Sequence, residues 1–142
     1  MSSFFKFLAA IICFMALAFG LIRIGVGSVL MAQAAGVIDI AAFDEPVTEI
    51  QQFMLEKNDQ ALIPLTPVSY LAVIAFMGVC LVFGAISAWQ QKATGYGLLL
   101  LYLLTHAVLF LNFQTINPKI NILLGGVVLL IILILANRQR QR

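Results

Sequence analysis

Four long apolar stretches dominate the sequence and limit the folds that the chain can adopt. A helix that crosses the hydrocarbon core of a bilayer needs about 20 mostly apolar residues. Stretches that meet or approach that length cover about residues 4–37, 67–89, 94–113 and 118–136. The chain is 63% hydrophobic and 10% charged, whereas an ordinary soluble domain is about 25% charged. The sequence therefore predicts an all-α integral membrane four-helix bundle, with residues 1–142 forming a single membrane domain.

The first stretch is longer than a bilayer requires, and Arg23 is its main interruption. We expect this helix to tilt, to project from the membrane, or to break near Gly25-Val26-Gly27. A signal peptide is an alternative interpretation of this stretch. Lys6 precedes an apolar run, and the segment after it, Ala32-Gln33-Ala34, resembles a cleavage site. The apolar region of a signal peptide is about 7–15 residues long. Because this run is well over that length, we favour a retained helix.

The distribution of basic residues predicts the orientation in the membrane. Lys and Arg near the span ends are enriched on the cytoplasmic side. The four-span arrangement places five basic residues on the side of the termini and two on the other. These are Lys6, Lys92, Arg138, Arg140 and Arg142 against Lys57 and Lys119. We therefore expect both termini in the cytoplasm of a bacterial cell, the spans in its inner membrane, and residues 38–66 outside.

The outer loop contains all six carboxylates of the chain, between Asp39 and Asp59. Within it, Glu45–Lys57 predicts a short amphipathic helix, because apolar residues recur at a spacing of three to four. One interpretation is a helix that lies on the bundle or in the lipid headgroups. The other is a lid over a pocket, or a surface on which a partner protein docks through Glu49, Phe53 and Glu56.

Polar side chains inside the spans are the best candidates for a site, because ionisable groups at membrane depth are costly and often functional. Arg23 and His106 stand out. At a rise of about 1.5 Å per residue, both fall beyond the middle of the bilayer on its outer side. We expect them to centre an outward-facing ligand pocket, in which Arg23 holds an anionic headgroup, a carboxylate or a quinone oxygen. Further members of this predicted pocket are Tyr102, Asn112, Asn117 and Asn121.

A purely structural interpretation of the same residues also stands. Arg23 extends to the outer headgroups in that case, as long basic side chains do near membrane surfaces. His106 and the asparagines then make single hydrogen bonds between helices. Small residues predict where helices approach closely. They are Gly20, Gly25, Gly27, Ser28, Gly78, Gly84, Ala85, Gly125 and Gly126.

Several classes of function find no support in the sequence. No nucleophile elbow, phosphate-binding loop, zinc motif or paired carboxylate is present. A single intramembrane histidine cannot by itself hold haem or a metal ion. The net charge of +2 is too small to indicate a nucleic-acid partner. We therefore expect no enzymatic activity, no cofactor and no metal site.

Three segments give the chain a resemblance to a known family. They are Leu21–Gly27 in the first span, the long first outer loop, and Gly97–Asn112 with His106 in the third span. The overall plan resembles small four-helix bacterial membrane proteins of the DoxX-like type. This resemblance implies an accessory role, since some such proteins are linked to membrane redox complexes.

Three functions follow from these features, and they remain open at this point. The first is a non-catalytic accessory or assembly subunit that docks on a larger membrane complex. The second is a protein that binds a lipid or a quinone in the pocket around Arg23 and His106. The third is a small transporter or channel, which requires self-association because four helices are few for a pathway. An immunity protein that shields the membrane from a toxin is a further alternative.

Overall fold

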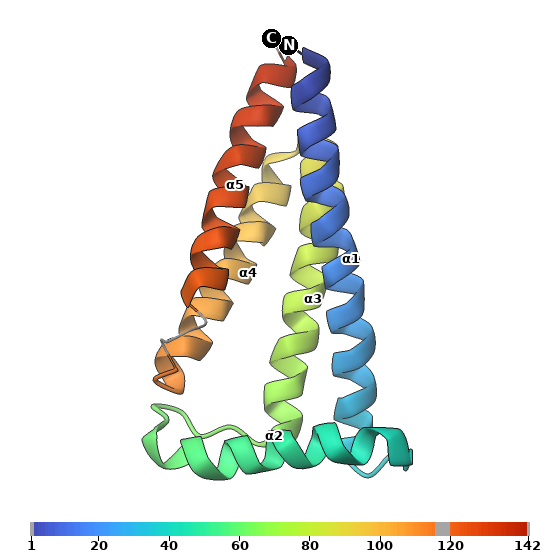
Figure 1. Cartoon of the computed structure of the whole chain (residues 1–142), viewed down its shortest axis with the longest axis vertical. Helices are drawn as coiled ribbons and strands as arrows, with labels where there is room; N and C mark the ends of the chain where they lie inside the picture. Colours follow the sequence, from blue (N-terminus) through green and yellow to red (C-terminus); the bar gives the residue numbers. More distant parts are fainter. Residues whose placement is uncertain (1, 116–119, 142) are drawn as a thin grey trace.

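The computed structural model describes residues 2–115 and 120–141, and this part of the chain contains five α-helices and no strand (Figure 1). Four of them are long and apolar enough to cross a membrane. The fifth, α2, lies in the loop between the first two long helices. Short 3-10 helices at Ala41–Phe43 and Asn58–Gln60 flank it. The α-helices are α1 (Ser2–Ala34), α2 (Asp44–Lys57), α3 (Pro67–Trp89), α4 (Ala93–Asn112) and α5 (Ile120–Gln141).

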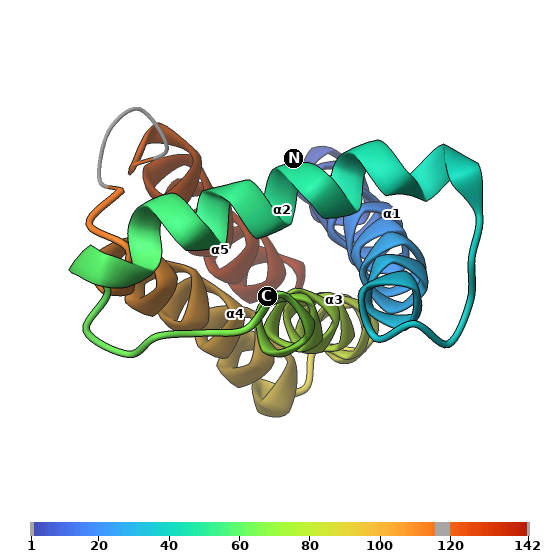
Figure 2. The ribbon, with the colours of Figure 1, turned by 90° about the horizontal axis from the view of Figure 1, so that it is seen from below.

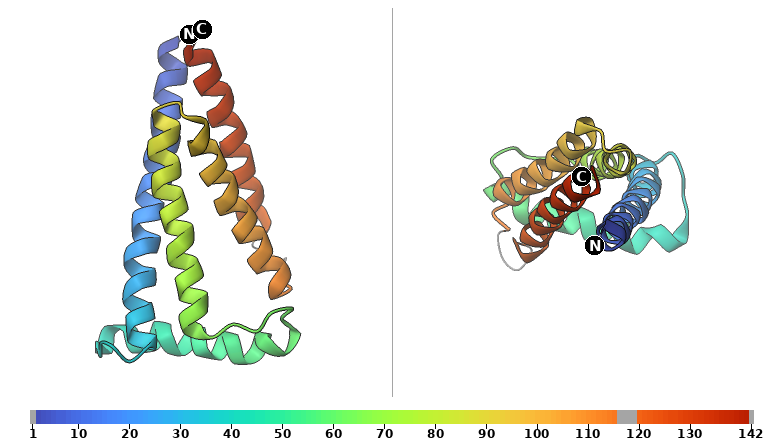
Figure 3. Two further views of the ribbon diagram at one scale, coloured as in Figure 1. Left: turned by 180° about the vertical axis from the view of Figure 1, so that it is seen from behind. Right: turned by 90° about the horizontal axis from the view of Figure 1, so that it is seen from above.

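The four long helices meet at one end of the molecule and separate toward the other. At the narrow end, the two termini lie close together (Figures 1 and 3). Helices α1 and α3 run side by side, whereas α4 and α5 diverge from them toward the wide end. Helix α2 lies across the wide end, roughly perpendicular to the long helices (Figure 2). The two helix pairs are therefore farthest apart at the end that α2 covers (Figure 1).

Helix α1 is continuous through Gly25-Val26-Gly27, so the break that was one of the three expectations does not occur. The helix ends at Ala34, three residues before the predicted end at Val37. Gly36 adopts a φ of 71°, which is a common way to end a helix. The N–H of Val37 then donates to the carbonyl of Ala32, and that of Gly36 to the carbonyl of Gln33, both at 2.9 Å.

Glycines allow α1 and α3 to approach closely. A Cβ atom on Gly78 would lie 2.7 Å from the backbone oxygen of Gly20, and one on Gly27 would lie 3.3 Å from the nitrogen of Ala75. The prediction that small residues mark close helix packing is confirmed at these positions. Gly25 is different, because a Cβ atom there would meet nothing within 4 Å.

The narrow end is fixed by the short turn between α3 and α4 and by one side chain from α5. Asn137 is 1% exposed. Its Nδ2 donates to the backbone oxygen of Ala88 at 3.0 Å and to the hydroxyl of Tyr96 at 2.9 Å. Gly95 packs directly on Ala88, where no larger residue would fit. Three helices are therefore joined at this end.

Helix α2 forms in the loop where an amphipathic helix is expected. Its inner face buries Val47 and Met54. Phe53 packs against Phe113, with ring centroids 5.4 Å apart, and against Tyr70 at 6.3 Å. This aromatic contact joins α2 to α3 and to the end of α4, and it holds α2 over the space between the long helices.

The last two spans differ slightly from the expected ranges. Helix α4 covers Ala93–Asn112 in place of 94–113. Helix α5 extends to Gln141, beyond the expected end at 136. The predicted start of that span at Pro118 lies outside the described residues, as does Asn117. The span of α3 agrees with the expected range, and the hydroxyls of Thr66 and Ser69 cap its first turn.

Candidate functional site

A cavity of about 240 Å³ lies between α2 and the long helices. It is lined by both residues on which the predicted pocket is centred. Arg23 reaches it from α1 and His106 from α4. We call it the polar cavity. The other residues that line it are Phe19, Phe53, Tyr70, Ile74, Leu109, Phe110, Phe113, Thr115 and Ile122. The structure thus brings Arg23 and His106 together, although they are 83 positions apart in the chain.

The side chain of Arg23 points away from α2. Its guanidinium carbon lies 4.7 Å from the ring centroid of Phe19, one helical turn earlier on α1, and 5.5 Å from that of Tyr102 on α4. Both distances are in the range of a cation–π contact. Helical side chains lean toward the N-terminus of their helix, and that direction leads here to the narrow end. The side chain of Arg23 therefore extends toward the narrow end of the molecule.

The guanidinium contacts sulfur and aromatic rings. Nη1 lies 3.9 Å from the sulfur of Met77. Nε is buried and has no hydrogen-bond partner among the described residues. All six carboxylates of the chain are on exposed residues between Asp39 and Asp59, and none lines the cavity. The positive charge of Arg23 thus faces the polar cavity without a carboxylate beside it.

His106 forms one wall of the cavity within a row of rings on α4. Its ring centroid is 5.7 Å from that of Tyr102 and 4.5 Å from that of Phe110, its neighbours one turn away on either side. Tyr102 lies beneath the Arg23 guanidinium. The three predicted site residues Arg23, Tyr102 and His106 therefore belong to one connected group.

Of the predicted asparagines, Asn112 and Asn121 do not join this group, and Asn117 lies outside the described residues. The side chain of Asn112 holds the outer loop: its Oδ1 accepts from the N–H of Ile63 at 2.7 Å, and its Nδ2 donates to the oxygen of Ile63 at 2.9 Å. Its backbone oxygen accepts from Leu62 at 3.2 Å. Asn121 is exposed and lines neither cavity. Asn112 therefore positions the segment between α2 and α3.

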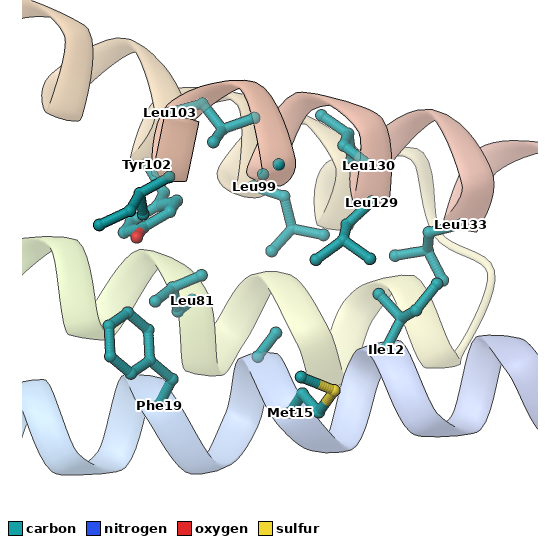
Figure 4. A pocket seen from close by; sticks show the side chains of 14 residues that line it. Ile12, Met15, Phe19, Leu81, Leu99, Tyr102, Leu103, Leu129, Leu130 and Leu133 are labelled. Atoms are coloured by element: carbon teal, nitrogen blue, oxygen red, sulfur yellow. The ribbon is translucent and has the colours of Figure 1, made fainter. Parts of the chain in front are cut away.

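A second cavity, of about 310 Å³, lies between α1, α4 and α5, with Leu81 of α3 in its wall (Figure 4). We call it the apolar cavity. Side chains of α1 and α5 face each other across it, among them Met15 and Leu129. Its lining is Ile12, Met15, Ala16, Phe19, Leu81, Leu99, Tyr102, Leu103, Ile122, Gly125, Gly126, Leu129, Leu130 and Leu133.

The two cavities adjoin. Phe19 and Ile122 line both of them, and Tyr102 lines the apolar cavity while its ring lies beneath Arg23. Along the molecule, the polar cavity lies nearer α2 and the apolar cavity nearer the narrow end. The combined space therefore has one end with a cation and a histidine and a longer end with only hydrocarbon walls.

The three residues predicted to dock a partner separate into two environments. Glu49 and Glu56 are exposed on α2, and they are seven positions apart, so they share one face. Phe53 instead turns inward and lines the polar cavity. The helix is thus both a cover for the cavity and a carrier of acidic side chains.

The apolar cavity was not predicted, and its residues give little signal in the sequence. Leucine, isoleucine and phenylalanine also form the lipid-facing surface of these spans. The local sequence feature at this cavity is the pair Gly125 and Gly126, which the sequence predicts to mark close helix packing. Gly126 does so, since its Cβ would lie 2.6 Å from Leu103, but a Cβ on Gly125 would meet nothing within 4 Å. Gly125 lines open space in the cavity wall.

Within the described residues, no three His, Cys, Asp or Glu side chains are grouped so that they could hold a metal ion. No known family model matches the chain, and neither a curated protein nor a solved structure shows significant similarity to it. Conclusions about function therefore depend on the two cavities and the residues that line them.

Proposed function

We propose that this chain is a multi-pass membrane protein that binds an amphipathic molecule of the lipid or quinone class. The observation that carries the proposal is the junction of the two cavities at Phe19 and Ile122. A polar head would occupy the space beside Arg23 and His106. A hydrocarbon chain would extend between α1 and α5. This is the second of the three functions that the sequence leaves open.

The size and surroundings of the cavities support a small-molecule ligand. Sites for such ligands measure about 300–1,000 Å³ and are lined mostly by apolar side chains with a few polar groups. Met15 and Ile122 line the apolar cavity and are 58% and 61% exposed, so the cavity is open at its side. In a bilayer that side faces lipid, which gives a hydrophobic ligand a direct route of entry.

Filling the apolar cavity tests the proposal. In Gly125→Leu, the new side chain would project into open space in the cavity wall and compete with the ligand chain. Each buried CH₂ group contributes about 0.8 kcal/mol, so displacing about two methylene groups of the ligand chain should lower ligand retention roughly tenfold. The measurement is mass spectrometry of lipids and quinones that remain bound to the full chain after purification in mild detergent.

Gly97→Leu is the matched control. Gly97 also has nothing within 4 Å of a built Cβ, but it is on α4 and lines neither cavity. This variant should retain ligand like the unmodified protein. Equal retention by all three proteins, or a preparation in which nothing is bound, would contradict the proposal.

The cellular placement is part of the proposal. We propose that the chain lies in a bacterial inner membrane with both termini in the cytoplasm, which puts α2 on the outer face. The support is the excess of basic residues at the narrow end, where Lys6, Lys92 and Arg138 lie. The polar cavity then opens in the outer half of the bilayer.

Docking on a larger membrane complex is a second candidate. Four exposed positions of α2, Glu45, Glu49, Gln52 and Glu56, fall on one helical face and give it an acidic surface. The accessory role that the DoxX-like resemblance implies agrees with such a surface. Native mass spectrometry of the same preparation distinguishes the two candidates, because a docked chain is recovered with a stoichiometric foreign subunit.

A further inference from the structure

We propose that the head of the bound amphiphile is an anionic oxygen group, a carboxylate or a phosphate, and that it pairs with Arg23. This inference depends on the proposed function, because it names the chemistry of the ligand for the same two cavities. It assigns Arg23 as the residue that selects the ligand.

The positive charge of Arg23 is costly at its depth in the span. The Arg23 guanidinium is always protonated in proteins. Arg23 is eleven residues before the end of α1, which is roughly 16 Å along the helix, and its side chain turns farther into the span. A cation at such a depth is unfavourable unless an opposite charge or polar groups surround it. An anion in the polar cavity supplies the opposite charge that Arg23 requires.

None of the described residues that line the polar cavity supplies an anion. Nη1 contacts a thioether, the faces of the guanidinium contact aromatic rings, and Nε has no hydrogen-bond partner. The other polar side chains of the cavity wall are Tyr70, His106 and Thr115, and none of them carries negative charge. A cationic head would meet a like charge in this space and is disfavoured.

The guanidinium of Arg23 lies at the junction of the two cavities. The two rings on which it lies, Phe19 and Tyr102, both line the apolar cavity. Figure 4 shows these two side chains at the same end of that cavity, with the leucines of α5 extending away from them. A head paired with Arg23 therefore places its first carbon atoms at the entrance to the hydrocarbon-lined space.

An anionic head compensates the charge of Arg23, whereas a neutral acceptor does not. A quinone carbonyl would accept a hydrogen bond from the guanidinium but would leave its charge uncompensated. Carboxylates and phosphates match the planar donor geometry of arginine with two parallel hydrogen bonds, which are roughly twice as strong as neutral ones. The charge and the donor geometry of arginine thus favour a fatty acid or a phosphate-bearing lipid over a quinone.

The test compares three probes with the same hydrocarbon chain on the full-length protein in an uncharged maltoside detergent, which contains no phosphate or carboxylate. Oleate carries a carboxylate, oleyl phosphate carries a phosphate, and oleyl alcohol carries no charge. Binding is measured by native mass spectrometry at a pH where oleate is ionised. Since hydrogen bonds to charged groups contribute about 1.5–3 kcal/mol, we expect one or both anions to bind roughly tenfold to a hundredfold tighter than the alcohol.

Two variants test whether Arg23 itself causes the preference for an anion: Arg23→Gln and its matched control Arg138→Gln. Both remove one positive charge, but Arg138 is exposed near the end of α5 and lines neither cavity. Arg23→Gln should lower anion binding to the level of the alcohol and leave alcohol binding unchanged. Arg138→Gln should keep the full preference. Circular dichroism of both variants checks that the helices are retained.

Each outcome decides a different point. A preference for oleate alone or for oleyl phosphate alone identifies the source of the anion and supports the inference. Equal binding of all three probes by the unmodified protein would overturn the anionic head and leave the proposed function intact. An anion preference that persists in Arg23→Gln would overturn the role of Arg23. If no probe binds and no lipid is retained, the proposed function itself fails.

Discussion

Polar residues of the same type have different roles in this protein, and their surroundings decide which role each one has. Asn112 is 6% exposed and holds the backbone of Ile63 with two hydrogen bonds. Asn121, near the start of the next helix, is exposed. Both were candidates for the ligand site, and neither lines it. Arg23 does line it, because its side chain leans along α1 toward Tyr102.

Replacing Asn112 should therefore destabilise the protein without acting on the ligand directly. Asn112→Ala leaves the N–H and the carbonyl of Ile63 without their partners, and such a loss costs about 1–3 kcal/mol. We expect a lower midpoint in thermal unfolding, followed by circular dichroism in detergent. Asn121→Ala should leave the midpoint unchanged. A shift of the same size in both variants would mean that the Asn112 contacts do not stabilise the loop.

At the scale of elements, α1 and α3 form the closest helix pair, and α5 is held mainly at the narrow end. The close pair depends on backbone contact at Gly20 and Gly78. The clamp at the narrow end depends on the hydrogen bonds of Asn137 to Ala88 and Tyr96. The apolar cavity exists because α5 diverges from α1 beyond that clamp (Figures 1 and 4).

The close approach of α1 and α3 can be tested by adding a single methyl group between them. In Gly78→Ala, the new Cβ would lie 2.7 Å from the backbone oxygen of Gly20 and 2.9 Å from the backbone nitrogen of Ile24. Backbone atoms cannot rotate away, so the helices must separate, and we expect a loss of about 1–3 kcal/mol. Gly25→Ala, at a site with open space, should be neutral or slightly stabilising. Thermal unfolding measures both, and equal stability would refute the close approach.

At the scale of the whole molecule, both termini lie at the narrow end and α2 covers the wide end (Figure 1). In a membrane this arrangement puts the termini on one side and α2 on the other. The two native cysteines, Cys13 and Cys80, are buried, so a cysteine introduced at an exposed position can report its side of the membrane.

Labelling of intact bacterial cells with a membrane-impermeant maleimide tests this orientation. Glu56→Cys on α2 should react directly if α2 lies outside. Gln139→Cys, near the end of α5, should react only after the cells are permeabilised. Both positions are exposed, so a difference in reactivity reports the side of the membrane. The opposite pattern would reverse the proposed orientation, and reaction of both positions in intact cells would contradict four spans.

The apolar stretches by themselves predict four long helices, and the spacing in residues 45–57 predicts α2, because helix length and periodicity are local properties. Some helix ends are less apparent: Gln91 and Gln114 adopt φ values of 60° and 51°, where glycine is the usual residue. The asymmetry of charge is also a property of the sequence alone. These features are enough to predict a membrane protein with an acidic loop.

The candidate site was decided by the tertiary structure. Arg23 and His106 are conspicuous in the sequence because charge and imidazole are rare in apolar helices. Their shared cavity depends on how far α4 and α5 diverge from α1 and α3, which follows from close packing at Gly20, Gly78 and Gly95 and from the Asn137 clamp. The apolar cavity has no local signature, because a leucine that faces lipid and one that lines a cavity are the same residue. Only the angles between the helices distinguish them.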